Sequence, residues 1–554
     1  MKLTGAQIIV ETLIEQGVTD VFGYPGGQVL NIYDALYESR DRINHYLTAH
    51  EQGAAHAADG YFRASGKVGV VIATSGPGAT NLVTGIATAM LDSVAMVAIT
   101  GNVPCNLIGK DSFQEIDITG ITLPVTKHNF FVNDISKLAD SIREAFQIAK
   151  SGRPGPVLID VPKDIQTAVY EYTPAPVVGK WENPKATDAQ IDQAVEMIAQ
   201  SRRPYIYIGG GAIGAGIEQQ VMDLAEKIDA VIGCTLMGLS AVPTDHPRFL
   251  GMQGMHGHYA SSVAQNHADL ILAVGVRFSD RATGNVQKYA RNARIIQLDL
   301  DFAEVNKNIP VDLGILADVR DSFVRIAEKA APKKNPEWMD MVDSYRQKEH
   351  SQKIRQDLNP YTLVNTVNKY TDSNTVIATD VGQHQMWAAQ YAKLYRSRTW
   401  ASSGGLGTMG YGMGAAIGAH VSSGQRVVLF TGDGSFGMNL NEMVTAVRYN
   451  IPVTIVIFNN GVLGMVRQWQ TLFFGKHYSN TTLGGMVDYL LLAEAFGAKG
   501  LRAATVEEFD AAFREAFTTD GPVIIDCLID KDEFVLPMLP PGGSMDDIIT
   551  EKGE

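Results

Sequence analysis

The chain has 554 residues, and at about 150 residues per compact domain this length predicts three or four folding units rather than one small binding module. Its composition is 45% hydrophobic and 19% charged, which excludes a mainly disordered or fibrous chain. The formal net charge is −14 and no Lys/Arg-rich run occurs, so we expect no nucleic-acid partner.

Residues 1–17 carry apolar side chains at helical spacing, interrupted by Glu11 and Glu15. This pattern predicts an amphipathic helix of the folded domain and not the apolar core of a signal peptide. No stretch approaches the ~18 uninterrupted apolar residues that a membrane span needs. The three cysteines form no CxxC pair, which favours free thiols in a reducing compartment. We therefore expect a cytoplasmic protein without a membrane partner.

Apolar runs of strand length alternate with helical patterns in three series. Continuous apolar runs without polar alternation are typical of parallel strands covered by helices on both faces. The sequence thus predicts an α/β protein with three doubly wound parallel-sheet domains. The predicted strands lie at 68–74, 96–100 and 156–161, then at 204–208, 269–276 and 293–300, and finally at 375–381, 426–432, 452–459 and 522–529.

Two segments rich in Pro and polar residues, at 170–188 and around 331–340, separate the three series and read as linkers. A charged, helical stretch is expected between the second linker and Pro360. The tail contains too little apolar surface to fold alone, so it is either disordered or closes over a site. The predicted limits are 1–168, 188–328 and 358–535 for the domains and 536–554 for the tail.

The third series contains two motifs that follow neighbouring strands. The strand 426–432 delivers Gly432, Asp433 and Gly434, and the strand 452–459 delivers an Asn pair ending at Asn460. Their spacing fits one helix and one strand, so both motifs lie at the carboxyl edge of one parallel sheet. Asp433 and Asn460 offer hard oxygens for Mg²⁺, and the glycines let backbone amides approach a diphosphate. Each motif alone is a common turn, but together they resemble the thiamine-diphosphate-binding motif.

Thiamine diphosphate needs a carboxylic acid against N1′ of its aminopyrimidine ring. Glu51 is a candidate, because it directly precedes an Ala/Gly-rich helix and lies just beyond a predicted strand at 45–49. On sequence alone a solvated cap is the commoner explanation for one Glu at the end of a strand. The thiamine-enzyme resemblance favours the catalytic role.

GxGxxG spacing occurs twice, at 405–410 and at 209–214. The first follows no clear strand, so we reject a dinucleotide fingerprint there, and the resemblance instead makes Met409 the apolar wedge that bends thiamine diphosphate. The second follows the predicted strand 204–208 and is a dinucleotide-site candidate. A plain strand-to-helix turn is an equal alternative for it.

Along nearly its whole length the chain resembles the catalytic large subunit of acetohydroxyacid synthase (acetolactate synthase). Single short motifs recur by chance, but an ordered series of this length does not. The matching segments are GYPGG (23–27), HEQG (50–53), SGPGATN (75–81), LIGKDSFQE (107–115), TKHNF (126–130), SGRPGPVLIDVPKDIQ (151–166), LGMQGMHG (250–257), VGVRFSDR (274–281), DVGQHQMW (380–387), GDGSFGMN (432–439), NNGVLGMVRQWQ (459–470) and PMLPPG (537–542).

The resemblance implies a thiamine-diphosphate fold and a carboligase reaction. Pyruvate would be decarboxylated on thiamine diphosphate, and the hydroxyethyl unit transferred to a second 2-oxo acid. Pyruvate as acceptor gives 2-acetolactate, towards valine and leucine, and 2-oxobutyrate gives 2-aceto-2-hydroxybutyrate, towards isoleucine. The cofactors implied are thiamine diphosphate, Mg²⁺ and an FAD that does no net redox chemistry.

The resemblance also implies roles for individual residues. Catalysis is assigned to Glu51, Gly27, Gln114 and Lys163, and substrate selection to Trp469 and Val466. Mg²⁺ would be held by Asp433, Asn460 and the carbonyl of Val462. Thiamine diphosphate would contact Pro77, Asn81, Gln383, His384, Gly407, Met409, Gly432, Asp433, Gly434, Ser435, Asn460, Leu463, Gly464 and Met465. FAD would contact Arg153, Gly209, Gly210, Gly211, His256, Arg277, Asp280, Arg281, Asp299 and Asp318.

In this family one active site takes its Glu-bearing domain and its GDG-bearing domain from different subunits. We therefore expect a homodimer or tetramer, and the family also allows a separate small regulatory subunit. A pyruvate oxidase or decarboxylase of the same superfamily is the alternative, against which Gln114, Lys163, Trp469 and the segment 250–257 argue. A catalytically silent scaffold would lack the catalytic acid or the metal ligands, which are present here.

The chain departs from the family pattern at three places. The family usually has FDDR where this chain has FSDR, so Ser279 replaces the first Asp of that motif. This replacement weakens the FAD assignment slightly. The family usually has GLP where Met413 and Gly414 make GMG in this chain. Gly414 is expected to loosen the start of a helix near the cofactor. The family often has a Pro-Arg pair where Pro104 is followed by Cys105 and Asn106 in this chain. This difference would alter the lining of the substrate channel.

Overall fold

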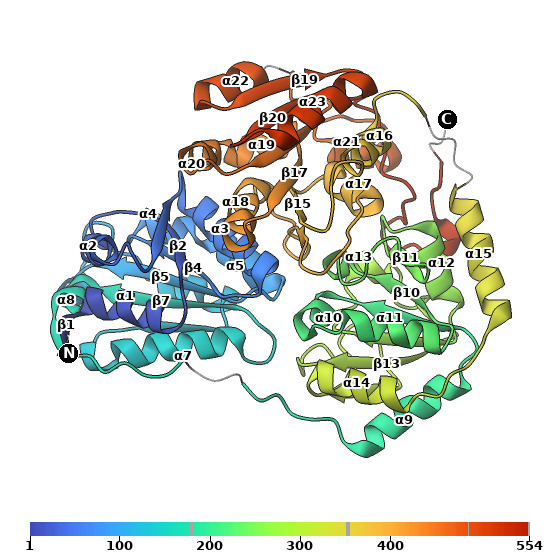
Figure 1. Cartoon of the computed structure of the whole chain (residues 1–554), viewed down its shortest axis with the longest axis horizontal. Helices are drawn as coiled ribbons and strands as arrows, with labels where there is room; N and C mark the ends of the chain where they lie inside the picture. Colours follow the sequence, from blue (N-terminus) through green and yellow to red (C-terminus); the bar gives the residue numbers. More distant parts are fainter. Residues whose placement is uncertain (178–180, 351–354, 486, 552–554) are drawn as a thin grey trace.

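The computed structural model describes all residues except 178–180, 351–354, 486 and 552–554. Its described part contains three six-stranded sheets, and all strand pairs within them are parallel. Figure 1 shows the N-terminal unit in blue, the central unit in green opposite it, and the C-terminal unit in orange and red above both. The predicted α/β architecture with three doubly wound parallel sheets is confirmed.

The N-terminal sheet has the strand order β3-β2-β4-β5-β7-β6, and its central strands are buried on both faces. Its strands are β2 (Asp20–Tyr24), β3 (Asn44–Leu47), β4 (Gly69–Ala73), β5 (Met96–Asn102), β6 (His128–Phe131) and β7 (Pro156–Pro162). Its helices are α1 (Gly5–Glu15), α2 (Leu30–Glu38), α3 (Glu51–Ser65), α4 (Pro77–Asn81), α5 (Val83–Leu91), α6 (Ile118–Thr122), α7 (Leu138–Lys150) and α8 (Lys163–Thr167). The amphipathic helix predicted near the N-terminus is α1, which begins at a capping box between Thr4 and Gln7.

The central sheet has the order β11-β10-β9-β12-β13-β14. Its strands are β9 (Pro204–Ile208), β10 (Val231–Cys234), β11 (Phe249–Met252), β12 (Leu270–Val274), β13 (Arg294–Asp299) and β14 (Leu313–Leu316). The surrounding helices are α9 (Asp188–Gln200), α10 (Gly210–Ala215), α11 (Glu218–Lys227), α12 (Tyr259–His267), α13 (Asp280–Thr283), α14 (Val319–Lys329) and α15 (Pro336–His350).

The C-terminal sheet has the order β16-β15-β17-β18-β20-β19. Its strands are β15 (Thr375–Thr379), β16 (Trp400–Ala401), β17 (Arg426–Gly432), β18 (Val453–Asn459), β19 (Lys499–Ala503) and β20 (Val523–Leu528). Its helices are α16 (Pro360–Val367), α17 (Gln383–Tyr391), α18 (Gly412–Ser423), α19 (Asp433–Asn439), α20 (Met443–Arg448), α21 (Gly464–Phe473), α22 (Tyr489–Phe496) and α23 (Val506–Thr518). Among the described residues, none of the helices has the length and apolar content needed to cross a bilayer.

The segments between the units differ in part from the predicted linkers. A short antiparallel sheet joins β1 (Lys2–Thr4) to β8 (Val169–Glu171), so paired structure continues a few residues beyond the predicted limit at 168. Helix α15 begins at Pro336, inside the second predicted linker, because Pro suits the first helical position and Trp338 becomes fully buried. Residues 178–180 of the first linker and 351–354 of the charged stretch lie outside the described residues.

The tail, which the sequence left as either disordered or closing over a site, packs on the central unit. The backbone amide of Leu539 donates to the carbonyl of Met255 at 2.7 Å, and that of Asn285 donates to Gly543 at 3.0 Å. Met538 also pairs with Ile549 as an isolated bridge. Residues 552–554 of the tail lie outside the described part of the chain.

The N-terminal and C-terminal units meet along α3 and α18, which lie side by side in Figure 1. Small residues permit this contact: a Cβ added at Gly418 would lie 1.8 Å from the carbonyl oxygen of Ala57, and one added at Gly60 would lie 2.1 Å from that of Ala415. At Gly414 the added Cβ would lie 2.6 Å from the carbonyl oxygen of Gly53. Gly414 is buried within α18 and fits this close packing, so the structure shows no loosened helix start at this departure.

We expect Gly418→Ala to lower the free energy of unfolding by about 1–3 kcal/mol, because the added methyl meets a backbone oxygen that side-chain rotation cannot move. Urea unfolding followed by circular dichroism measures the change. Gly214→Ala is the matched control, since Gly214 lies exposed in α10 with no atom within 4 Å of an added Cβ. Equal stability of the two variants would contradict close packing of α3 on α18.

Candidate active site

Three adjacent parallel strands of the C-terminal sheet, β15, β17 and β18, end at one edge, and a helix follows each of them. Gln383 and His384 open α17, Asp433 opens α19, and Asn460 stands directly after β18. Since β17 pairs with both β15 and β18, the three turns lie side by side. The sequence expectation that the GDG and Asn-Asn motifs share one carboxyl edge is met by this sheet order.

Asp433 lies in a partly buried position where the two motifs meet. The backbone amides of Gly434 and Gly461 point to its carboxylate, and burial raises its pKa to about 6. Asn460 accepts a hydrogen bond from the backbone amide of Val462 at 3.1 Å. No cluster of three or more His, Cys, Asp or Glu side chains suited to a metal occurs among the described residues. A cation at this edge would therefore rely on Asp433, neutral oxygens and the ligand's own phosphates.

The surroundings of Asp433 fit a diphosphate. Gln383 Oε1 and His384 Nε2 are buried and have no hydrogen-bond partner in the described part of the chain. Burial also lowers the pKa of His384 to about 3, so this ring is neutral. A Cβ added at Gly432 would lie 2.9 Å from His384 Nδ1, and one added at Gly464 would lie 1.9 Å from Gln383 Oε1, so these glycines let the two side chains pack closely against the turns. The unpaired His384 Nε2 can donate to an anionic group at this turn, whereas Gln383 Oε1 is an acceptor and its Nε2 already donates to Gln468 and to the Glu533 carbonyl.

The loop between β16 and α18 carries Gly407 and Met409 to the same edge. The backbone amide of Gly410 donates to Ser435 Oγ at 3.2 Å, which ties the Met409 loop to α19. Met409 is half-buried. The short strand β16 does precede this loop, but it pairs only at the sheet edge through Trp400 and Ala401. Leu463 lies under the turn, where a side chain at Gly434 would strike it.

The predicted catalytic residues of the N-terminal unit gather at the carboxyl edge of its own sheet. Lys163 Nζ donates to the carbonyl of Gly27 at 3.1 Å, and Asn81 Nδ2 donates to Glu51 Oε2 at 3.0 Å. Glu51 is the first residue of α3 and is half-buried. Pro77 occupies the first turn of α4, in the segment that follows β4.

Gln114 completes this N-terminal group. Its backbone has φ +61°, a left-handed conformation that is uncommon for Gln and that occurs more often at functional sites. A Cβ at Gly76, just before Pro77, would lie 2.9 Å from the Gln114 Cβ, so only Gly allows this contact. These residues therefore come from different loops and helix ends to one edge of the sheet: Gly27, Glu51, Asn81, Gln114 and Lys163.

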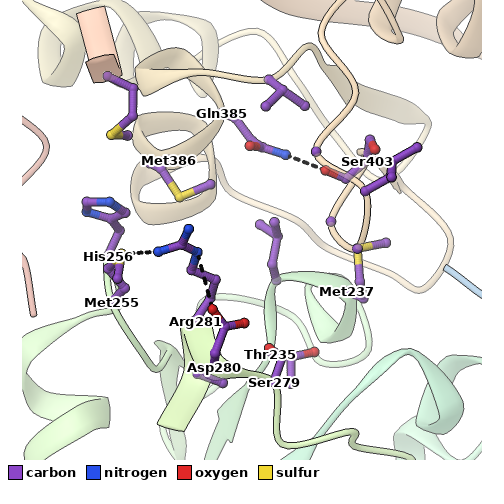
Figure 2. Close-up of a pocket in the computed structure, with 18 of the residues that line it drawn as sticks. Thr235, Met237, Met255, His256, Ser279, Asp280, Arg281, Gln385, Met386 and Ser403 are labelled. Carbon is purple, nitrogen blue, oxygen red and sulfur yellow. Dashed lines mark hydrogen bonds and ion pairs between the residues drawn. The ribbon is translucent and has the colours of Figure 1, made fainter. Parts of the chain in front are cut away.

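A cavity of about 1380 Å³ lies between the carboxyl edge of the central sheet and the C-terminal unit. Figure 2 shows Thr235, Met237 and Arg281 of the central unit facing Gln385 and Ser403 of the C-terminal unit across it. The volume exceeds the ~300–1,000 Å³ of ordinary small-molecule pockets, so the cavity has room for a ligand of dinucleotide size. All of its lining residues come from the central and C-terminal units.

The flavin candidates divide into two groups. Five of them line the cavity: Gly210, His256, Arg277, Asp280 and Arg281. Arg277 is strongly desolvated, and its guanidinium makes no hydrogen bond or ion pair in the described part of the chain, so it is available to an anionic ligand. His256 Nδ1 is buried and also without a partner among the described residues. These features fit a flavin diphosphate.

The other five lie outside the lining, and their assignment stays a prediction. Arg153 pairs with Asp301 and Glu304, Asp299 accepts from the amide of Asp301, and Asp318 caps α14. Gly209 and Gly211 pack against the backbone of Gly275, where a Cβ would lie 2.1 and 2.6 Å from it. Two glycines of the GxGxxG spacing, Gly209 and Gly211, thus permit close helix–strand packing, and the neighbouring Gly210 borders the cavity.

Several cavity residues were not predicted: Thr235, Met237, Gln385, Met386 and Ser403. The strand before Thr235 is only four residues long and was not recognised in the sequence. Gln385 lies within the DVGQHQMW segment, but Ser403 lies just before the GxGxxG spacing at 405–410 and outside every matching segment. Their signal is positional, because each follows the carboxyl end of a parallel strand.

Two departures from the family pattern lie close to these sites. Ser279 lines the cavity, so the wall has a hydroxyl where the family pattern has a carboxylate. The backbone amide of Cys105 donates to Asp164 at 3.0 Å, and burial together with Asp164 raises the pKa of the Cys105 thiol to about 11. Cys105 is therefore an uncharged part of the loop after β5.

Comparison with known families covers each unit separately. Residues 3–121 match the model of the "Thiamine pyrophosphate enzyme, N-terminal TPP binding domain", residues 191–326 that of the central domain, and residues 380–527 that of the C-terminal TPP binding domain. Three parallel sheets in this order, with the Gly432-Asp433-Gly434 motif at the carboxyl edge of the third sheet, define a thiamine-diphosphate-dependent enzyme.

Curated relatives narrow the class. The chain is 43% identical to the probable acetolactate synthase large subunit of Methanococcus aeolicus, covering 99% of this chain and 95% of that protein. It is 41% identical to the isozyme 3 large subunit of Escherichia coli (100% and 99% covered) and 44% identical to its isozyme 2 large subunit (99% of both). The chain belongs to the acetolactate synthase large-subunit family.

Proposed function

We propose that this chain condenses two 2-oxo acids at a site shared between two copies of itself. It decarboxylates pyruvate and transfers the hydroxyethyl unit to pyruvate or to 2-oxobutyrate. The observation that carries the proposal is the carboxyl edge of the C-terminal sheet, where Asp433, the unpaired His384 Nε2, and the cavity wall at Met465 and Val466 converge. Bound thiamine diphosphate would supply the electron sink that decarboxylation of a 2-oxo acid requires.

In the proposal the C-terminal unit binds and bends the cofactor. Asp433, Asn460 and the Val462 carbonyl would hold Mg²⁺, His384 would donate to the diphosphate, and Gln383, whose Nε2 already donates to Gln468 and to the Glu533 carbonyl, would lie beside it. The remaining cofactor contacts are backbone amides or apolar side chains, namely Gly407, Met409, Gly432, Gly434, Ser435, Leu463, Gly464 and Met465. Hard oxygen ligands and a neutral histidine donor suit a magnesium diphosphate.

The N-terminal unit supplies the proton chemistry and the substrate contacts. Glu51, oriented by Asn81, would exchange a proton with the aminopyrimidine ring of bound thiamine diphosphate. Lys163 and Gln114 bind the substrate carboxylate, and Gly27 presents its amide near the reacting carbon. The hydrogen bond from Lys163 Nζ to the carbonyl of Gly27 holds these two residues in place relative to each other.

Within the single chain, the described residues show no hydrogen bond or ion pair from Glu51 to Asp433 or Asn460. Large apolar side chains are also exposed on the segments that carry the two half-sites, including Phe113 at 84%, beside Gln114, and Met438 at 60%, in α19. Exposed apolar surface beside an incomplete site favours closure by a second copy. We therefore propose a homodimer, alone or paired into a tetramer, as the active unit.

FAD is proposed as the occupant of the cavity, with Arg277 on its diphosphate and Gly210 at close backbone approach. Arg281 and Asp280 border the same space. The flavin is assigned a structural role, because in this family it undergoes no net redox change. A separate small regulatory subunit, implied by the name "large subunit" of the relatives, is an optional partner.

The cytoplasmic location and the domain limits 1–168, 188–328 and 358–535 are part of the same proposal. Free thiols support the location: Cys105, Cys234 and Cys527 form no disulfide. The three sheets and the three matched family models support the limits.

The test is an assay of the purified chain with pyruvate, Mg²⁺ and thiamine diphosphate, with and without FAD, quantifying 2-acetolactate. Acetolactate formed only when FAD is present supports the whole proposal. Acetaldehyde or acetate as the main product would move the chain to the pyruvate decarboxylase or oxidase alternative. Acetolactate formed equally without FAD would remove the flavin from the proposal.

Trp469 is expected to select the larger acceptor. Its ring borders the cavity, lies edge-on to Phe473 at 5.7 Å between centroids, and has the Arg281 guanidinium 5.7 Å above it. One extra methylene against such a surface is worth about 1–3 kcal/mol, so Trp469→Leu should lower the preference for 2-oxobutyrate over pyruvate about tenfold.

Competition between the two acceptors, read as the ratio of the two products, measures the Trp469 effect. Phe474→Leu is the control, because Phe474 also borders the cavity but is 61% exposed. An unchanged product ratio in Trp469→Leu would contradict the selection role.

A further inference from the structure

The loop of residues 403–411, which carries Gly407 and Met409, begins with a run of exposed glycine-rich backbone. Gly404, Gly405 and Gly407 are exposed, and they border the cavity. Glycine backbone loses more conformational freedom on ordering than any other residue type, so such a loop keeps one shape only if specific partners hold it. The partners that hold this loop are therefore decisive for where Met409 lies.

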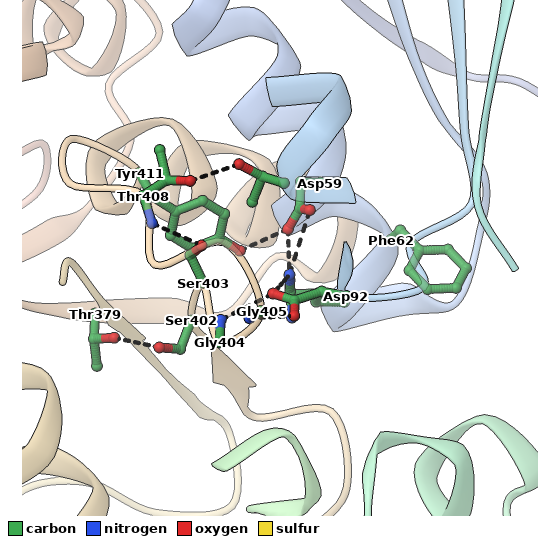
Figure 3. A network of polar contacts seen from close by, with 12 residues as sticks. Asp59, Phe62, Asp92, Thr379, Ser402, Ser403, Gly404, Gly405, Thr408 and Tyr411 are labelled. Atoms are coloured by element: carbon green, nitrogen blue, oxygen red, sulfur yellow. Dashed lines mark hydrogen bonds and ion pairs between the residues drawn. The ribbon is translucent and has the colours of Figure 1, made fainter. Parts of the chain in front are cut away.

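Asp92, just after α5 of the N-terminal unit, holds the start of the loop. Its fully buried carboxylate accepts the backbone amide of Gly404 at 2.9 Å and that of Gly405 at 2.7 Å, one on each oxygen. Figure 3 shows Asp92 directly beside these two glycines. Charge-assisted hydrogen bonds to two successive amides are strong and directional, so they define the local backbone conformation.

An ionic network extends from Asp92 to the far end of the loop. Arg63 of α3 donates to Asp92 at 2.9 Å and to Asp59 at 2.5 Å. Asp59 also accepts from the hydroxyl of Tyr411 at 2.6 Å. The loop is thus held at Gly404 and Gly405 on one side and at Tyr411 on the other by one set of buried charges.

Two further contacts lie between these ends. Thr88 of α5 and Thr408 share a hydrogen bond at 2.7 Å, directly beside Met409. The Thr408 amide donates to Ser403 Oγ at 3.0 Å, which closes the loop on itself. Buried ion networks often add little to net stability, but removing one member leaves uncompensated charge and releases whatever the network orders.

We propose that Asp92, kept in place by Arg63, is a positioning residue for the cofactor: it sets the conformation of residues 403–411 and thereby places Met409 and Gly407 against thiamine diphosphate. The proposal rests on the proposed function, because it assumes that this loop contacts the cofactor. Neither Asp92 nor Arg63 is among the residues that line the cavity. The role is exerted through the two glycine amides.

The first test is the affinity of the purified full-length chain for thiamine diphosphate with Mg²⁺, measured by calorimetry. Asp92→Asn keeps the size of the side chain but loses the charge and one acceptor oxygen, and it should weaken binding about 10- to 100-fold, as losses of supporting contacts do. Asp229→Asn is the matched control: Asp229 also pairs with an arginine, Arg248, and accepts a backbone amide, but it lies in the central unit. Its affinity should equal that of the unaltered chain.

The second readout is hydrogen exchange followed by mass spectrometry. In Asp92→Asn, peptides covering 403–411 should exchange faster, while peptides of α3 and α18 keep their protection. Faster exchange throughout α3 and α18 would mean that Asp92 only supports the interface, and it would overturn the proposal. Unchanged exchange of 403–411 would overturn it as well.

A double-mutant cycle separates positioning from general destabilisation. Met409→Ala alone should weaken cofactor binding, but it should have little further effect in the Asp92→Asn background, because Met409 is already misplaced there. Full additivity of the two changes would overturn the proposal. If the unaltered chain binds no thiamine diphosphate with Mg²⁺, the proposed function itself fails. Binding by the unaltered chain together with equal affinity in Asp92→Asn refutes this inference alone.

Discussion

Glu51→Gln is expected to lower kcat for acetolactate formation by about 10²- to 10⁴-fold, the usual contribution of a positioned acid or base. The amide keeps the size of the side chain and its contact with Asn81, but it transfers no proton at N1′. Because Asp433 and its neighbours are unaltered, the affinity for thiamine diphosphate should change far less than kcat. Initial rates at saturating cofactor, together with calorimetric binding, measure both quantities.

Asp34→Asn is the control for the Glu51 variant. Asp34 is an exposed carboxylate on α2 of the same unit, and its loss should leave kcat unchanged. Retention of more than about a tenth of the original kcat in Glu51→Gln would contradict the assignment of Glu51 as the proton-holding group.

Asp433→Ala is expected to abolish Mg²⁺-dependent binding of thiamine diphosphate. It removes the charged member of the proposed ligand set from a partly buried position, and breaking such an interaction costs about 3 kcal/mol or more, which is over 100-fold in affinity. Calorimetric titration with cofactor at several Mg²⁺ concentrations measures this. The unaltered chain should bind more tightly as Mg²⁺ rises, whereas Asp433→Ala should respond little.

Chelation with EDTA followed by readdition of Mg²⁺ is the matched control on the unaltered chain. Binding should disappear and return. If Asp433→Ala binds the cofactor with an unaltered Mg²⁺ dependence, the metal lies elsewhere and the ligand set is wrong.

Mixing the two inactive variants tests the shared site. In a dimer of one Glu51→Gln chain and one Asp433→Ala chain, one site receives an intact Glu51 and an intact Asp433, and the other receives neither. Random exchange of subunits makes about half of the dimers mixed, so about a quarter of the original activity should return. If both residues of a site came from one chain, no activity would return.

The three-sheet architecture was predictable because each buried parallel strand leaves a continuous apolar run. The runs at 204–208 and 426–432 coincide with β9 and β17 to the residue. Short strands leave no such run: β10 has four residues and was not predicted, whereas the partly buried β3 overlaps the strand predicted at 45–49. The helix start at Pro336 was missed for a related reason, because Pro resembles a linker residue until its helix packs.

The two motifs at the carboxyl edge of the C-terminal sheet were predictable from the sequence. The GDG and Asn-Asn motifs each follow a clear strand, and parallel strands bring their carboxyl ends to one edge. The assignment of Gly209 and Gly211 to a dinucleotide was not decidable in this way, since close backbone packing against Gly275 requires the same glycines. Arg277 and Arg153 look alike in sequence, yet only Arg277 borders the cavity without an ionic partner among the described residues.

The sequence alone determined the fold class, the family and the chemistry-bearing motifs of this chain, because these depend on local periodicity and on short segments that follow strands. Only the tertiary structure decided which residues meet across the units. Asp92 and Gly404 are far apart in the chain, and their contact depends on how closely α3 packs on α18 through Gly60 and Gly418. Contacts of this kind arise from the shape of packed surfaces, and no local pattern of residues records that shape.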